Sequence, residues 1–258
     1  MKPVLDTAKH SWGAESDTKK AAFIAKMVEQ KIIPKYSGCG NFMDFYHYLT
    51  NEKAFNTSGN YYRYLNTFGA ITQEMGVIAG KKIVETGGAS PISTFLAREN
   101  DCYSTDSDLR IGIDVETSFA DIVISLEVAE HIKDQPENNF NDIVLFNGSG
   151  IRCFANETHR IIKPGGSLLL TTPNCCSYRA IQNAINHEAP YIFRQHVREY
   201  NKSELVDVFK KFNVKNHLTQ FNFFMLGNQS LDFDKLFNEQ NWSIEDRGDD
   251  HFFHFQKQ

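Results

Sequence analysis

A short segment, KKIVETGGASPIS at residues 81–93, has the residue types of a ligand-binding turn. Two apolar residues predict a short strand, Glu85 follows them, and Gly87 and Gly88 are adjacent. Glycine accepts unusual φ angles and lets a ligand approach the backbone closely. A strand that turns into a helix presents backbone N–H groups to a nucleotide-like cofactor. The segment therefore predicts either a cofactor-binding turn or an ordinary connection between a strand and a helix.

A second signal is an acidic residue at a suitable distance. Asp106 lies 21 residues after Glu85, just beyond the next apolar run. At about this spacing, nucleotide-binding folds place the carboxylate that accepts hydrogen bonds from ribose hydroxyls. Asp108 is a rival for the role, and a solvated loop aspartate is the alternative to both.

The elements that must position these residues change in kind along the chain. Up to the turn the chain reads as helical, and after it short apolar runs alternate with helices, which predicts a parallel sheet with crossovers. The expected strands are 82–86, 102–105, 110–115, 120–126, 167–173, 214–224 and 251–256. The expected helices are 16–34, 41–55, 61–76, 151–162 and 202–211.

Helix-end signals support this division. Pro34 is expected to stop the first helix, and the KPGG run at 163–166 is expected to end the helix before it. Ser90 suits an N-cap with Pro91 in the first turn, and Asn201 suits another. We expect a helical N-terminal cap over 1–60 and a Rossmann-like α/β domain over 61–258.

Composition narrows the class of protein. The chain has 258 residues, 41% hydrophobic and 23% charged, as in soluble globular proteins. A net charge of −5 gives no reason to expect a nucleic-acid partner. We expect no signal peptide and no membrane span, because the N-terminus and the apolar runs fit neither. Five cysteines without zinc-binding spacing predict free thiols in the cytoplasm and no metal site.

Two later segments carry a family resemblance. FADIVISLEVAEHI at 119–132, followed by ETHRIIKPGGSLLLTTPN at 157–174, resembles the later motifs of class I S-adenosylmethionine-dependent methyltransferases. The resemblance covers roughly residues 62–256. It implies a seven-stranded, mostly parallel sheet, S-adenosyl-L-methionine as cofactor, and methyl transfer as the activity.

The resemblance also implies roles for individual residues. The motif that cradles the methionine part of the cofactor corresponds here to Glu85, Gly87, Gly88 and Ala89. The carboxylate that binds the ribose hydroxyls corresponds to Asp106 or Asp108. Asp114, with Val115, falls where the adenine amino group is bound, and Ser125, Leu126 and Glu127 lie beside the sulfonium. Two departures stand out: Ala89 and Pro91 replace family glycines, and the segment between Asp106 and Asp114 is too short for the usual helix.

The acceptor side is less defined. His131 and His196 are the candidates to take the proton of an attacking hydroxyl. The alternatives are structural: His131 orders its own loop, and His196 stabilises the segment that follows the fifth strand. Arg63 is a weaker candidate for a carboxylate of the cofactor or an anionic substrate. An insertion over about 174–200 is expected to cover the substrate.

The expected function is O-methylation of a sugar, glycan or other small-molecule hydroxyl. The sequence is compatible with a monomeric or an oligomeric enzyme. A non-catalytic cofactor-binding or scaffold protein that kept the fold is the alternative. A nucleotide-dependent oxidoreductase is disfavoured, because the spread glycine fingerprint is missing after the first strand.

Overall fold

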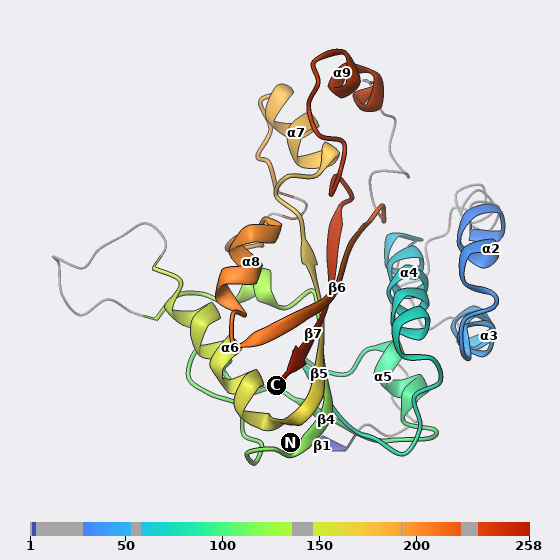
Figure 1. Cartoon of the computed structure of the whole chain (residues 1–258), viewed down its shortest axis with the longest axis vertical. Helices are drawn as coiled ribbons and strands as arrows, with labels where there is room; N and C mark the ends of the chain where they lie inside the picture. Colours follow the sequence, from blue (N-terminus) through green and yellow to red (C-terminus); the bar gives the residue numbers. More distant parts are fainter. Residues whose placement is uncertain are drawn as a thin grey trace, which may run out of the picture.

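The computed structural model describes residues 2–3, 28–52, 58–135, 147–191, 193, 195–222 and 232–258. Within these residues one sheet has the order β1-β3-β2-β4-β5-β7-β6 (Figure 1). Its strands are β1 (Lys2–Pro3), β2 (Lys82–Thr86), β3 (Asp101–Thr105), β4 (Ala120–Leu126), β5 (Ile162–Pro173), β6 (Phe212–Gln220) and β7 (Asp250–Lys257). The expected strands at 82–86 and 120–126 are confirmed with the same bounds.

The sheet is mixed rather than mostly parallel. β3, β2, β4 and β5 run parallel, whereas β7 is antiparallel to both β5 and β6, and β1 is antiparallel to β3. β1 has two residues, so six longer strands carry the architecture. This is a Rossmann-like sheet, as expected, with an antiparallel insertion near one edge.

Helices cover both faces of the sheet (Figure 1). One face carries α2 (Ile33–Tyr36), α3 (Phe42–Glu52), α4 (Ser58–Met75) and α5 (Pro91–Leu96), and the other carries α6 (Ser149–Ile161) and α8 (Lys202–Val208). α7 (Tyr178–Ile185) and α9 (Phe233–Glu239) lie beyond the carboxyl end of β5 and pack on each other. Two short helices, η1 (Val28–Ile32) and η2 (Ala129–His131), complete the described elements.

The core forms two layers separated by the sheet. Ile122 and Ile124 of β4 pack into the layer under α3, α4 and α5, whereas Val123 packs into the layer under α6 and α8. Successive strand residues point to opposite faces, so a strand buried on both sides is apolar throughout. That is why the consecutive apolar residues of β2 and β4 identify these strands in the sequence. Among the described helices, none is long and apolar enough to cross a membrane.

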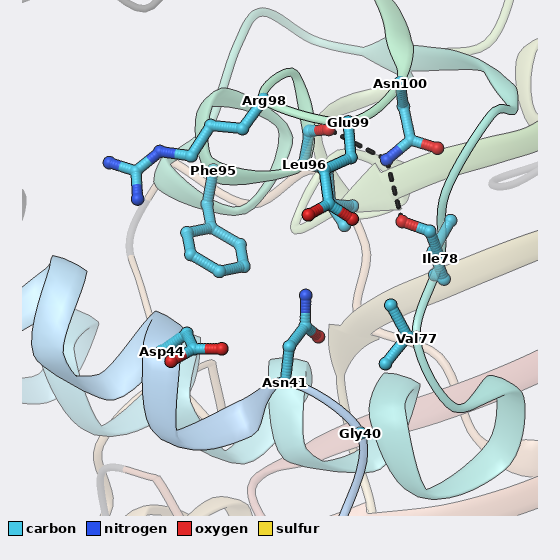
Figure 2. Close-up of a pocket in the computed structure, with 10 residues that line it drawn as sticks. All are labelled: Gly40, Asn41, Asp44, Val77, Ile78, Phe95, Leu96, Arg98, Glu99 and Asn100. Carbon is cyan, nitrogen blue, oxygen red and sulfur yellow. Dashed lines mark hydrogen bonds between the residues drawn. The ribbon is translucent and has the colours of Figure 1, made fainter.

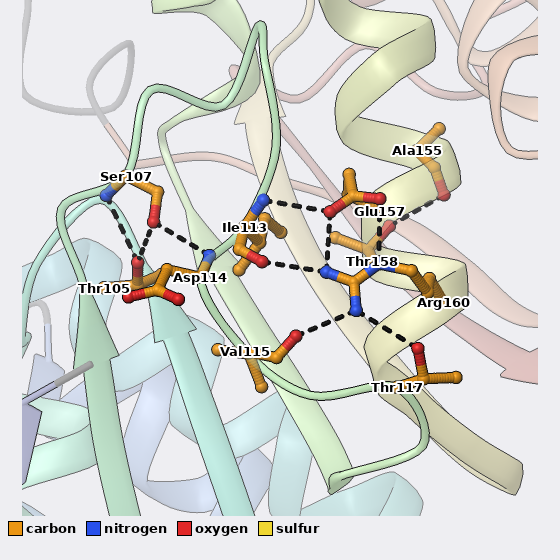
Figure 3. Close-up of polar contacts among 10 residues, drawn as sticks. All are labelled: Thr105, Ser107, Ile113, Asp114, Val115, Thr117, Ala155, Glu157, Thr158 and Arg160. Atoms are coloured by element: carbon orange, nitrogen blue, oxygen red, sulfur yellow. Dashed lines mark hydrogen bonds and ion pairs between the residues drawn. The ribbon is translucent and has the colours of Figure 1, made fainter.

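The expected strand at 110–115 is wrong. These residues form a loop that α6 holds by its side chains (Figure 3). The Arg160 guanidinium donates to the carbonyl oxygens of Ile113 and Val115, each at 2.8 Å, and the Glu157 carboxylate accepts from the Ile113 N–H at 3.0 Å. Only residues 106–119 separate β3 from β4, too few for two helical crossovers and a strand. The edge beside β3 is taken instead by β1.

Two helix ends also differ from expectation. Pro34 lies within α2 instead of ending a helix, since proline fits the first turn, where its missing N–H has no partner. KPGG begins β5 rather than ending α6, which stops at Ile161. Residues 16–27 of the first expected helix lie outside the described residues. Ser90 and Asn201 do cap α5 and α8, Asn201 in a capping box with Glu204.

Candidate active site

A cavity of about 670 Å³ opens at the carboxyl ends of β2 and β4. These strands are parallel neighbours, so both end at the sheet edge where open α/β folds bind ligands. Of the residues expected in the site, Glu85, Gly87, Gly88, Ala89, Leu126, Glu127, His131 and His196 line the cavity. Asp106, Asp108, Asp114, Val115 and Ser125 are not part of its lining. The structure thus joins the glycine turn to His131 and His196, which follow Gly88 by 43 and 108 residues in the sequence.

The glycine turn is held by the carboxylate that precedes it. Glu85, which is 2% exposed, accepts hydrogen bonds from the Ser90 N–H at 2.7 Å and from the Ser93 hydroxyl. Gly87 and Gly88 have φ angles of +82° and +104°. A Cβ built on Gly88 meets nothing within 4 Å, so the backbone there faces open space in the cavity. The backbone of the turn is therefore accessible to a cofactor in the cavity.

The two glycines give a matched pair of variants. We expect Gly88→Ala to lower the free energy of unfolding by about 1–2 kcal/mol through backbone strain alone. Gly87→Ala should cost about 1 kcal/mol more, because its Cβ would lie 2.6 Å from Cγ2 of Val128. Urea denaturation measures both, and equal losses would contradict the close contact. Gly88→Ala should weaken cofactor binding beyond its effect on stability, since its methyl enters the cavity.

Glu85 predicts a pH dependence. Burial raises the pKa of Glu85 from 4.5 to about 7, against the lowering effect of its serine hydrogen bonds. The folded state thus binds a proton more tightly than the unfolded state, so stability falls as pH rises from about 4.5 through 7. We expect Glu85→Gln to be more stable than wild type by about 3 kcal/mol at pH 8, with little difference at pH 4.5. Urea denaturation at both values tests this; a pH-independent difference would contradict it.

The end of β4 places a second carboxylate in the cavity. Glu127 has a φ of +56°, an uncommon conformation for a residue with a side chain, and its N–H donates to the Thr171 carbonyl at 3.0 Å. Its carboxylate pairs with Arg63 of α4 at 3.5 Å. Burial would lower the pKa of Arg63, but Glu127, Asp250 and Glu130 together raise it above its usual value. Uncommon backbone conformations of this kind occur most often at functional sites.

Two histidines of the cavity lining contact each other. His131 ends η2, His196 follows α7, and their rings lie 5.0 Å apart, edge to face. Nδ1 of His196 lies 2.6 Å from Glu199, a hydrogen-bond distance. Burial, and then His196, lowers the pKa of His131. Glu130 also lines the cavity, and burial followed by the charge of Glu127 raises its pKa well above the usual value.

The residues expected around the adenosine lie to one side. Asp108 lines a smaller cavity of about 230 Å³, together with His131, and makes two hydrogen bonds of 2.9 and 2.6 Å to Arg110. These bonds lower the pKa of Asp108 to about 2 and engage both carboxylate oxygens. Asp106 and Asp114 are exposed, and Val115 is buried in the core.

The cavity lining includes residues that the sequence did not indicate, among them Asn60, Arg179 and Phe193. Arg179 of α7 and Phe193 of the segment after it both line the cavity. Neither belongs to a motif, and only their place within residues 174–200 pointed toward the site. Ser125 was expected beside the sulfonium, but it is fully buried and absent from the lining.

A different hollow, of about 430 Å³, lies at the amino ends of β2 and β3 (Figure 2). There the Asn100 amide donates to the carbonyl oxygens of Ile78 and Leu96 at 2.9 and 2.8 Å. Asp44 and Arg98 stand at its rim (Figure 2). These contacts close the turn before β3. The hollow lies on the sheet edge opposite the one where this class of fold binds its ligands.

A Rossmann-like sheet with β7 inserted antiparallel, and a glycine turn beside a cavity after β2, define the class I methyltransferase fold. The family model described as methyltransferase domain matches residues 61–219, and the chain belongs to this family. The protein is an S-adenosylmethionine-dependent methyltransferase, and its cofactor is S-adenosyl-L-methionine. No curated protein matched the chain.

Several solved methyltransferase structures are similar to the chain at low identity. A methyltransferase from Archaeoglobus fulgidus is 14% identical, with 82% of this chain and 100% of that one covered and a TM-score of 0.48. The N-methyltransferase NodS from Bradyrhizobium japonicum, in complex with S-adenosyl-L-homocysteine, is 11% identical over 84% and 98% of the chains, with a TM-score of 0.48. A phosphoethanolamine N-methyltransferase from Haemonchus contortus is 13% identical over 74% and 52%, with a TM-score of 0.47.

Proposed function

We propose that this methyltransferase acts on a hydroxyl group of a sugar, glycan or other small molecule. The observation that best supports this is the convergence of His131 and His196, 5.0 Å apart, on the cavity that holds the glycine turn. A hydroxyl must lose its proton to attack, and imidazole nitrogen suits the activation of a hydroxyl near neutral pH. We therefore propose both histidines as catalytic residues.

The cofactor would be held by the turn and by the end of β4. We propose that Glu85 and the Gly87–Ala89 turn hold its methionine part and that Leu126 and Glu127 lie beside its sulfonium. The open space at Gly88 supports this assignment. When bound, S-adenosyl-L-methionine supplies an activated methyl group. The protein then has mainly to align the acceptor oxygen with it and exclude water.

The acceptor would enter from the side of α7. Arg179, Phe193 and His196 line the cavity, and all three belong to the 174–200 segment, which supports the proposal that this insertion covers the acceptor. Asn60 and Arg63 line it from α4. The side chains offered by α7 and its following turn are cationic, aromatic and imidazole groups, a set suited to a polar ring such as a sugar.

The adenosine contacts give a prediction with an internal comparison. Because both Asp108 oxygens are engaged by Arg110, we propose Asp106 as the ribose ligand. Asp106→Asn should weaken S-adenosylhomocysteine binding by about 1–3 kcal/mol, whereas Asp108→Asn should change it by less. Titration calorimetry measures both variants. The reverse order would assign the ribose to Asp108.

An acceptor panel tests the function itself. The full-length protein is incubated with S-adenosylmethionine carrying a labelled methyl group and with matched hydroxyl and amine acceptors of similar size. We expect label only in products methylated on oxygen. Label confined to amines would overturn the hydroxyl assignment. Cofactor binding without transfer to any acceptor would favour the non-catalytic alternative, in which the fold is kept as a binding or scaffold protein.

A further inference from the structure

Three side chains of the cavity form a cluster that methyl transfer itself does not require. Oε1 of Glu130 lies 3.8 Å from Nε2 of His131 and 3.9 Å from Nε2 of His196, and the three atoms lie within 4.8 Å of one another. These separations are too long for hydrogen bonds. With metal–ligand bonds of about 2.0–2.2 Å, two ligands of one ion lie up to about 4 Å apart. The cluster therefore has the spacing of a metal-ligand set.

Glu130 supplies an independent indication. Its side chain is fully buried, and its Oε2 accepts from the Thr172 hydroxyl at 2.9 Å. Among the residues that the structure describes, its Oε1 has no hydrogen-bond partner and points toward the two imidazole rings. A buried carboxylate oxygen is costly unless it is hydrogen-bonded, paired or bound to a metal. A cation between the three groups would satisfy it.

A second layer of contacts orients the cluster. Glu199 lies 2.6 Å from Nδ1 of His196, which directs Nε2 of that ring toward Glu130. The Glu130 carbonyl also accepts from the Val197 N–H at 2.8 Å, so the chain around His196 is tied to the residue it faces. Metal-binding histidines commonly donate their other ring nitrogen to a carboxylate in this way. The three groups are thus positioned before any ion binds.

We propose that Glu130, His131 and His196 bind one divalent transition-metal ion of the Zn²⁺ or Mn²⁺ type, in the cavity that the glycine turn also lines. Two imidazole nitrogens and one carboxylate oxygen suit such ions better than Ca²⁺ or Mg²⁺, which prefer oxygen ligands alone. Three protein ligands leave coordination positions open to the cavity. This inference rests on the proposed function: with the ion bound, His131 and His196 would act on the acceptor hydroxyl as ligands of the ion rather than as proton acceptors, and the hydroxyl would bind at those open positions.

Binding is tested without cofactor or acceptor. The full-length protein is freed of metal with a chelator, and Zn²⁺, Mn²⁺, Co²⁺ and Mg²⁺ are titrated calorimetrically. We expect one site for the transition metals, weaker binding of Mg²⁺, and a rise in Tm on binding. Glu130→Gln and His196→Gln should weaken that binding at least about 10-fold, and Glu199→Gln should weaken it less. His131→Gln is the variant that should disturb folding least, because the His131 side chain is 44% exposed.

The adjacent Cys175 and Cys176, with sulfurs 4.0 Å apart, are the competing ligands for these ions. The Cys175→Ser/Cys176→Ser double variant should keep the site, and Co²⁺ bound to wild type should show no thiolate charge-transfer band. Absence of a site, or binding kept in His131→Gln and lost in the cysteine variant, would overturn the proposal. Metal binding without O-methylation would instead refute only the proposed function. Full O-methylation in the metal-free enzyme would refute only the coupling of the ion to catalysis.

Discussion

His196→Gln should lower kcat by about 10²–10⁴-fold, the usual contribution of a group that activates a nucleophile. Nε2 of this ring faces the cavity and lies 3.9 Å from Glu130, so its loss removes a nitrogen from the acceptor side. Glutamine keeps a side-chain N–H that can donate to Glu199, which lies 2.6 Å from the histidine ring. The fold should therefore survive the change. Steady-state kinetics on the acceptor identified by the panel measures the effect.

The affinity for S-adenosylhomocysteine separates a catalytic from a structural cause. His196 belongs to the segment that follows α7, whereas the proposed cofactor contacts come from the turn from Gly87 to Ala89 and from the end of β4. We expect the dissociation constant to stay within about 3-fold of wild type while kcat falls, as for an interaction made mainly in the transition state. His187→Asn, at an exposed position of the same segment, is the matched control and should retain full kcat. A His196→Gln enzyme that also retains kcat would remove His196 from the catalytic groups.

The sheet was the most predictable part of the molecule. β2 and β4 are buried on both faces, so their apolar runs at 82–86 and 120–126 carried the signal without help from distant residues. The cap of α5 was equally local, because Ser90 accepts from backbone N–H groups two and three residues on. Local rules recover elements whose partners are close in sequence.

The errors arose where distant contacts decide the structure. The apolar residues at 110–115 look like a strand, but Arg160 and Glu157 hold them as a loop from 44 or more positions away. The neighbouring edge of the sheet is filled by Lys2–Pro3, a pairing that no local pattern indicates.

Only part of the site could be predicted from the sequence, for the same reason. His131 and His196 were each expected from motifs, but their contact depends on how the chain returns after β5. The expectation of no metal site considered cysteine spacing alone. Glu130 becomes a candidate ligand only once its buried, unpartnered oxygen is seen beside the two rings, within the part of the chain that the structure describes.

Arg63→Met should be the most destabilising of the cavity substitutions, lowering the free energy of unfolding by about 3 kcal/mol or more. The Arg63 side chain is 15% exposed, and that of its partner Glu127 is 11% exposed. Methionine keeps much of the volume but removes the positive charge that pairs with the buried Glu127 carboxylate at 3.5 Å and that limits the rise in the pKa of Glu130 and of Asp250. Such an uncompensated charge costs more than the pair itself contributes. Urea denaturation at neutral pH gives the loss.

The reverse change, Glu127→Gln, should cost less, because it removes a charge that raises the pKa of Glu130 and of Asp250, so that these carboxyl groups ionise more readily beside Arg63. The two single losses are therefore expected to be unequal. The Arg63→Met/Glu127→Gln double variant should recover at least about 1 kcal/mol relative to the sum of the singles, as for charges in direct contact. Additive losses would mean that the 3.5 Å pair does not couple these residues energetically. A loss below about 1 kcal/mol for Arg63→Met would place the pair among exposed ones, where water already screens the charges.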